Sequence, residues 1–286
     1  MRTAKRAILR LALVGWLGLT GMTGLTATFA QAAAPPEQVL PDSTVFFLKI
    51  KDVKQLKESF RLSQYGQLWN DPALKDFRED LLGKLKDTSN TLKEKIGVTL
   101  TELLELPQGG LSIAAVSQDD PALPISLAIL ADAGQNEAQF AEVLSRSSKQ
   151  IEDAGGKAST ESFSGRTLHV IQPPTPKGDG DDKSDTPPPP LVWTNVGGLF
   201  FIGSSPTLIK DLVSNNDGRS TGSLATIEAF TKTQAKTASD DTQALWFLDL
   251  SKVIKLATKA AGRSGEQQAQ QIEFLINELG INGLKS

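Results

Sequence analysis

Short β-branched and aromatic runs alternate along this chain with longer stretches in which apolar residues recur every three or four positions. The run 45–50 is typical of a buried strand, and an apolar stripe at helical spacing follows at Leu74, Phe77, Leu81 and Leu85. The same reasoning places further strands at 111–116, 124–131, 166–171, 191–196 and 199–203. Strands, hairpins and helices mixed in this order predict an α+β fold, with a largely antiparallel sheet flanked by amphipathic helices.

Short sequence motifs add detail to this predicted fold. In the first strand Phe46, Leu48 and Ile50 share one face and Val45 and Phe47 share the other, which predicts burial on both faces. Further signals are a helix start at Asp71-Pro72, a capping box from Asn136 to Gln139, a hairpin turn at Gly197-Gly198 and a helix cap at Ser205-Pro206. Residues 173–190 consist almost entirely of Pro, Gly, Asp, Lys and Ser, which predicts a disordered insertion loop inside the first unit.

The first 34 residues have the three-part design of a secretory signal peptide. A basic start precedes the apolar run 11–19, and small residues suited to cleavage follow at Ala30, Ala32 and Ala34. The alternative is an uncleaved membrane anchor, but a spanning helix needs about 20 apolar residues and this run is shorter. We therefore expect export to the periplasm or medium, with no stable membrane span after cleavage.

Composition excludes several classes of partner and chemistry. The net charge is −3, and removal of the four positive charges in residues 1–34 leaves about −7. Nucleic acid and anionic membranes need a basic face, so neither is expected as a partner. There is no cysteine, which rules out disulfides, thiolate chemistry and lipid attachment at a cleaved signal peptide.

The segment that starts at Asp241 resembles the one that starts at Asp42. At a constant offset of 200, apolar positions of the first segment fall on apolar positions of the second: Phe47, Leu48, Ile50, Val53 and Leu56 on Phe247, Leu248, Leu250, Val253 and Leu256. We therefore divide the mature chain into a first α+β unit, 35–240, and the start of a second repeat unit, 241–286. The second copy stops where the strand equivalent to 111–116 would begin, so we expect a truncated repeat.

Several short motifs carry a more specific resemblance. They are Leu40-Pro-Asp-Ser-Thr44, Asp52-Val53, Gly66-Gln-Leu68, Asp71-Pro72-Ala-Leu74 and Leu106-Pro107-Gln-Gly109. Over residues 38–116 the chain resembles uncharacterised exported proteins of planctomycete-type bacteria, which contain a domain of unknown function and are often longer. The resemblance implies export and this fold, and it implies no activity, cofactor or catalytic residue.

Candidate catalytic residues do not form a recognisable set. His169, the only histidine, lies in a strand pattern among apolar residues, where a structural role is the common one. Ser112 lacks the second glycine of a nucleophile elbow, and Ser205 is better used as a helix cap. The acidic cluster 179–185 fails the spacing of a calcium loop, so no metal site is predicted. No spacing selects a pair for glycoside hydrolysis among Glu102, Glu105, Asp132, Glu152, Asp153 and Glu161.

Aromatic residues are the remaining candidates for a binding surface. Trp193 and Trp246 sit inside strand patterns and are expected in the core. Tyr65, Leu68 and Trp69 precede the helix start at Pro72 and form a candidate partner patch, although core packing is the favoured alternative. The sequence contains no P-loop and no Gly-x-Gly-x-x-Gly motif, so no nucleotide cofactor is expected, nor any other cofactor.

The sequence therefore favours a non-catalytic exported protein that binds a protein or an envelope polymer. Two alternatives stay open. The first is an extracytoplasmic hydrolase that uses carboxylates or a hard metal, in which two or more of Asp132, Glu161 and the 179–185 cluster would meet in one pocket. The second is a fragment of a longer exported protein.

Overall fold

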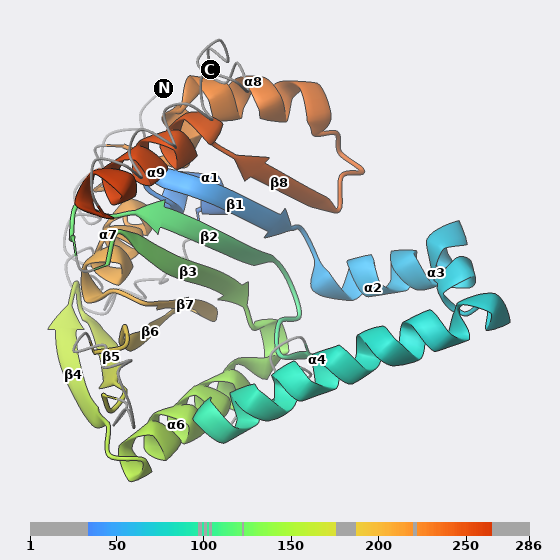
Figure 1. The fold of residues 1–286 in the computed structure, drawn as a ribbon. Coiled ribbons are helices and arrows are strands. Elements are labelled where there is room, and N and C mark those ends of the chain that lie inside the picture. Colours follow the sequence, from blue (N-terminus) through green and yellow to red (C-terminus); the bar gives the residue numbers. More distant parts are fainter. Residues whose placement is uncertain are drawn as a thin grey trace, which may run out of the picture. The chain divides into compact units, whose positions relative to one another are not determined.

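One antiparallel sheet organises the described part of the chain (Figure 1). The computed structural model describes residues 34–96, 99, 102, 105–121, 123–175, 187–219 and 222–264. Within them eight strands lie in the order β4-β5-β6-β7-β3-β2-β1-β8, and each neighbouring pair is antiparallel. The strands are β1 (Thr44–Ile50), β2 (Leu111–Ser117), β3 (Ile125–Asp132), β4 (Lys157–Phe163), β5 (Arg166–Gln172), β6 (Leu191–Val196), β7 (Leu199–Gly203) and β8 (Ala244–Leu248).

Helices flank this sheet, so the predicted α+β fold is confirmed. The α-helices are α1 (Pro36–Val39), α2 (Val53–Leu62), α3 (Gln64–Trp69), α4 (Lys75–Ile96), α6 (Glu137–Asp153), α7 (Pro206–Asn216), α8 (Glu228–Thr237) and α9 (Leu250–Ser264). Three single turns of 3-10 helix add η1 (Pro72–Leu74), η2 (Gly134–Asn136) and η3 (Leu224–Thr226). The expected helix after Asp71-Pro72 is one long helix, α4, preceded by η1.

Side chains from α1, α7 and α8 pack on one face of the sheet, which we call the closed face. Val39, Leu208, Leu212 and Phe230 are buried there together with alternate residues of the strands. The ring of Phe230 meets that of Phe47 edge to face at 5.8 Å, and it meets that of Phe247 at 5.3 Å. These three rings tie α8 to β1 and β8.

The opposite face, which we call the open face, is covered over only part of its width. Helix α6 buries its apolar stripe against β3, β5, β6 and β7, where Phe140 stacks on Phe200 at 4.4 Å between ring centroids. Over β2, β1 and β8 the apolar residues of this face are half-buried or exposed: Phe46, Leu48, Ile50, Leu111, Ile113, Ala115, Trp246 and Leu248. The predicted burial of the first strand on both faces is therefore wrong, because only its Val45 and Phe47 side is buried.

The two tryptophans predicted for the core have different positions. Trp193 is buried under α6, as expected, with 5% of its surface exposed. Trp246 is 66% exposed, so its predicted burial is wrong. The physical reason is that β8 is the last strand of the sheet and Trp246 lies on the open face.

Two local details also differ from expectation. The Asn136 side chain does not cap α6 and instead donates to the carbonyl oxygen of Leu106. Strand β4 was not expected, because six of its seven residues are exposed and its sequence, Lys-Ala-Ser-Thr-Glu-Ser-Phe, has no apolar alternation. By contrast, Gly197 and Gly198 form the expected hairpin turn, with φ of 62° and 88°.

The proposed repeat has a specific geometric counterpart. Strands β1 and β8, which carry the matching sequences, are direct neighbours, and Phe47 lies opposite Phe247. These residues are also equivalent in the proposed repeat, so a duplication would relate the two strands by a local two-fold axis between them. The matching run of residues that follows β1 forms α2, and the one that follows β8 forms α9. The duplication itself stays a prediction.

The N-terminal expectations lie largely outside the described residues. Residues 1–33, including Ala30 and Ala32, are not described, and the same holds for 176–186 and 265–286. Ala34 is described, and its N–H donates to Asn216 Oδ1 at 3.4 Å. Within the described ranges, no helix is both long enough and apolar enough to cross a membrane.

We predict that Phe47→Ala lowers the free energy of unfolding by about 3–5 kcal/mol, since the substitution leaves a cavity between α8, β1 and β8. The neighbouring Phe46→Ala should cost less than half as much, because Phe46 is only half-buried on the open face. Urea unfolding followed by tryptophan fluorescence measures both. Equal losses for the two variants would contradict the burial pattern described for β1.

Candidate functional site

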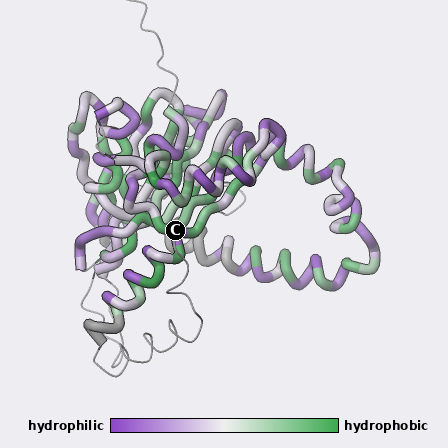
Figure 2. Tube along the Cα trace, turned by 90° about the horizontal axis from the view of Figure 1, so that it is seen from above, coloured by the Kyte–Doolittle hydropathy of each residue, from purple (hydrophilic) through white to green (hydrophobic). Residues whose placement is uncertain are grey.

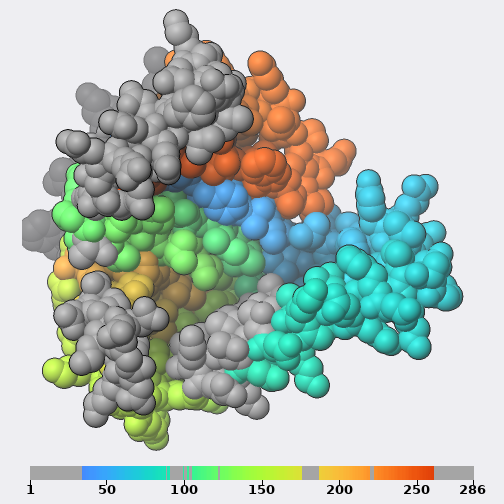
Figure 3. All heavy atoms as spheres, viewed as in Figure 1, coloured from blue at the N-terminus to red at the C-terminus, as the bar shows by residue number. Residues whose placement is uncertain are grey.

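Three helices between β1 and β2 carry most of the exposed apolar surface. We call α2, α3 and α4, together with the turn at η1, the helical arm. Its two ends attach to strands that pair directly with each other, and the arm reaches beyond the sheet in Figure 1 and Figure 3. Among the described elements, α4 contacts α6, while α2 contacts α3. Little of the arm is therefore covered by the other described elements.

The side chains of the arm confirm this exposure. In Figure 2, where apolar residues are coloured green, such positions recur along the arm. Its exposed large apolar residues are Phe60 (46%), Leu62 (62%), Tyr65 (76%), Leu68 (54%), Phe77 (60%), Leu82 (49%) and Leu85 (41%). Tyr65 and Leu68 of the candidate patch are thus exposed, and Trp69 is half-buried. The core-packing alternative for Tyr65 and Leu68 is wrong.

Side-chain caps define where helices α2 and α3 of the arm begin, and these caps need no apolar core. Asp52 caps α2 by accepting from the N–H of Gln55 at 2.7 Å. Ser63 ends α2 and also caps α3, since its hydroxyl accepts from the N–H of Gly66 at 3.1 Å. A Cβ at Gly66 would lie 2.0 Å from the carbonyl oxygen of Phe60, so only glycine allows this close approach of the two helices.

The charges of the arm are balanced and largely neutralise one another. Residues 53–96 contain nine basic and seven acidic side chains. Ion pairs join Arg61 to Glu58 at 2.6 Å and Lys84 to Asp80 at 2.9 Å, all between exposed groups. Such pairs contribute little to stability. The arm therefore offers an apolar surface with no dominant charge.

The remaining exposed large apolar residues form a second group, on the open face of the sheet and at the start of α9. They are Ile125 (42%), Leu127 (57%), Trp246 (66%), Leu248 (39%), Leu250 (47%) and Val253 (36%). Every exposed large apolar side chain of the described residues thus belongs either to the arm or to this second group. Elsewhere, the described sheet and helices bury their apolar faces.

His169 lies in a shallow pocket beside α6. Its ring stacks on that of Trp193 at 3.8 Å, and the indole N–H of Trp193 donates to Ser148 Oγ at 3.4 Å. The cavity has a volume of about 520 Å³, and Glu152 and Asp153 also line it. Within the described residues, His169 makes no hydrogen bond to either carboxylate. Stacking is therefore the contact that defines this histidine, and an oriented acid–base pair is not formed.

Burial lowers the pKa of His169 from its ordinary value of 6.5, because the partly desolvated ring disfavours the imidazolium. The structure thus favours the neutral ring at neutral pH.

The other sequence candidates lie apart. Ser112 is buried within β2, and Ser205 caps α7. Asp132 Oδ1 accepts from the N–H of Gly134 at the end of β3. Glu161 on β4 pairs with Lys210 at 2.6 Å.

Glu102, Glu105 and the possible metal ligands are the remaining candidates from the sequence. Glu102 pairs with Arg146 at 2.6 Å, and Glu105 is exposed. Among the described residues no group of three or more His, Cys, Asp or Glu could hold a metal ion. The 179–185 cluster lies outside the described residues.

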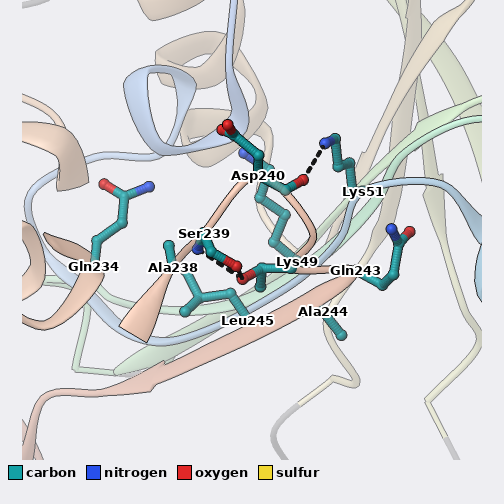
Figure 4. A pocket seen from close by; sticks show the side chains of 10 residues that line it. Lys49, Lys51, Gln234, Ala238, Ser239, Asp240, Gln243, Ala244 and Leu245 are labelled. Atoms are coloured by element: carbon teal, nitrogen blue, oxygen red, sulfur yellow. Dashed lines mark hydrogen bonds between the residues drawn. The ribbon is translucent and has the colours of Figure 1, made fainter. Parts of the chain in front are cut away.

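A smaller cavity of about 220 Å³ lies between β1, β8 and the loop after α8 (Figure 4). Its lysines already have partners. Lys49 pairs with Glu37 at 3.0 Å, and Lys51 donates to the carbonyl oxygen of Asp240 at 3.0 Å. Gln243 Oε1 is buried there with no hydrogen-bond partner. Because Lys49 is held by Glu37 and Lys51 by a carbonyl oxygen, this cavity is a weaker candidate than the arm.

Comparison with known proteins identifies no relative: no protein-family model, no curated protein and no solved structure matches this chain.

We predict a pKa below 6.5 for His169 in the folded protein. Because this is the only histidine, its imidazole protons give one set of NMR signals to follow. The unfolded state binds the proton more tightly, so the stability contributed by the neutral ring is fully present above pH 6.5 and is lost as the pH falls below 6.5 through the lower pKa of the folded state. His169→Gln should remove this part of the pH dependence. An unchanged pKa in urea-unfolded protein would contradict burial as the cause.

Proposed function

We propose that this chain is an exported, non-catalytic binding protein whose helical arm binds an apolar helix of a partner protein in the periplasm or cell envelope. One observation carries the proposal: the arm exposes seven large apolar side chains, each between 41% and 76% exposed. Soluble monomers rarely expose contiguous apolar patches larger than a few hundred Å². Such a surface is typical of a protein–protein contact.

The spacing of the arm residues favours a helical partner. Tyr65 and Leu68 are three positions apart on α3, and Phe77 and Leu85 lie two turns apart on α4. Residues at this spacing form ridges along a helix, and the grooves between such ridges accept the side chains of another helix. The balanced charge of the arm supports an apolar contact over one steered by charge.

The hydrolase alternative has no specific support. Of the carboxylates that it would bring together, Asp132 accepts from the N–H of Gly134 in the turn after β3, and Glu161 pairs with Lys210 of α7. The 179–185 cluster lies outside the described residues. Strands β3 and β4 are separated in the sheet by β7, β6 and β5. No second function is therefore proposed.

Export rests on the basic start, the apolar run and the small residues of positions 1–34. We expect the protein recovered from the envelope or medium of its host to begin at residue 31, 33 or 35, after Ala30, Ala32 or Ala34. Intact-mass spectrometry with N-terminal sequencing measures this. A protein that keeps Met1 and is recovered in the cytoplasmic fraction would refute export.

A photo-cross-linking residue at Tyr65 should give a discrete adduct with one envelope protein. The matched control is the same residue at Thr160, which is exposed on the polar strand β4 and should give no such adduct.

The variant Tyr65→Ala/Leu68→Ala/Phe77→Ala, with the cross-linker at Leu62, should reduce the adduct at least tenfold, since central apolar contacts each contribute about 1 kcal/mol or more. Its fold should persist, because substitutions of exposed side chains change stability by about 0.5 kcal/mol or less each. Equal adducts from position 160, or an undiminished adduct in the variant, would count against binding by the arm.

A further inference from the structure

The outer edge of β8 has backbone groups that no strand of the described residues pairs with. Lys51 N–H donates to the carbonyl oxygen of Gln243, and Asp249 N–H donates to that of Val45. In an antiparallel ladder, backbone groups of alternate residues point to opposite sides of the strand. The odd-numbered residues of β8 therefore bond to β1. The N–H and C=O groups of Ala244, Trp246 and Leu248 point away from the sheet.

The repeat shows what this edge lacks. Phe46 and Leu48 are the equivalents of Trp246 and Leu248, and their backbone groups point to β2, the second neighbour of β1. The side chains of Phe46 and Leu48 are only half-exposed, while Trp246 is 66% and Leu248 is 39% exposed. In the proposed repeat, β8 therefore corresponds to β1, a strand that has neighbours on both sides.

The two edges of the sheet differ in chemistry. At the other edge, β4 carries Lys157 and Glu161 and is exposed along nearly its whole length. Charged edge residues are a common means of preventing strand addition. Strand β8 reads Ala-Leu-Trp-Phe-Leu and contains no charged residue and no proline. The β8 edge therefore lacks the charged residues and proline that commonly block pairing.

We propose that a second copy of this chain pairs with the free edge of β8 through its own β8, which forms a two-fold symmetric dimer with a sheet continuous across both copies. Within the described sheet, a second copy has two free edges to offer, β4 and β8. The charged β4 edge does not match the apolar β8 edge, whereas β8 matches itself. Antiparallel pairing of one strand with its own copy is the self-complementary contact that two-fold symmetry requires.

The register of this contact follows from the direction of the unpaired backbone N–H and C=O groups of β8. The outward residues Ala244, Trp246 and Leu248 must lie opposite outward residues of the second copy. Pairing over the full strand places Trp246 opposite the second copy's Trp246, and Ala244 opposite its Leu248. Cross-strand aromatic pairs stabilise such ladders.

Analytical ultracentrifugation of the mature full-length chain tests the proposal, over a series reaching about 100 µM because a contact of this size is at the weak end of specific interfaces. We expect twice the monomer mass at high concentration. Trp246→Pro removes one outward N–H and spares the bonds to β1, so it should raise the dissociation constant at least tenfold. Leu248→Lys, which adds an edge charge, should do the same.

The matched control is Leu127→Lys, which adds the same charge to another exposed residue of the open face, on β3. It should leave the dimer intact. A dimer lost in Leu127→Lys but kept in Trp246→Pro and Leu248→Lys would place the contact on the sheet face and overturn edge pairing. A chain that stays monomeric over the whole series would overturn the proposal outright.

The absence of cysteine allows a direct test of register. Trp246→Cys should form a disulfide-linked dimer on mild oxidation, since paired strand residues lie within the distance a disulfide spans. Ala244→Cys and Leu248→Cys should cross-link when mixed and much less when alone. Cross-linking of Trp246→Cys mainly to a different protein in the envelope would assign the edge to another partner and refute self-pairing.

The dimer is independent of the proposed function of the arm. The variant Tyr65→Ala/Leu68→Ala/Phe77→Ala should dimerise normally, and Trp246→Pro should keep the adduct formed at Tyr65. A dimer lost in the arm variant and kept in Trp246→Pro would refute self-pairing through β8.

Discussion

Incomplete cover of one sheet face determines where this protein exposes apolar surface. A strand that buries one side must place alternate residues on the other side, and those residues lose water only where something packs on them. Helix α6 covers the part of the open face formed by β3, β5, β6 and β7. Over β2, β1 and β8 the same alternation leaves Leu48 and Ile113 half-buried and Trp246 exposed. The proposed binding surfaces lie beside this region, on the arm and at the β8 edge.

The elements that were predictable from sequence are those whose pattern reflects burial. Strands β2, β3, β5, β6 and β7 and helices α4, α6 and α7 were all expected close to their observed bounds. Strand β4 was not, because it lies at a solvated edge and its pairing to β5 comes from backbone hydrogen bonds that need no apolar residue. Trp246 shows the converse case. Its strand pattern is genuine, but the pattern does not reveal that the described helices leave Trp246 exposed.

At the candidate site, too, the sequence pattern did not reveal which apolar residues are left uncovered. Tyr65 and Leu68 were selected as a patch by their residue types, but Phe77 and Leu85 were assigned to an ordinary helix stripe, and the exposed Leu62 and Leu82 were not singled out. A helical stripe indicates that one side of a helix is apolar, and it does not specify what lies against that side. Only the placement of α2 and α4, with most of their surface away from the sheet, distinguishes an interaction surface from a core.

Pairing of β1 with β8 has a consequence for how the molecule is assembled. The two strands lie about 200 residues apart in sequence, and contacts between such distant segments form late and slowly. Until β8 arrives, Phe47 faces a site that still lacks Phe247, and one edge of β1 remains unpaired. Synthesis begins at the N-terminus, so β1 must wait for β8, the last described strand of the sheet. Contact of Phe47 with Phe230 and Phe247 is therefore a late step of folding, and until then this apolar side chain and the open edge of β1 can make wrong contacts.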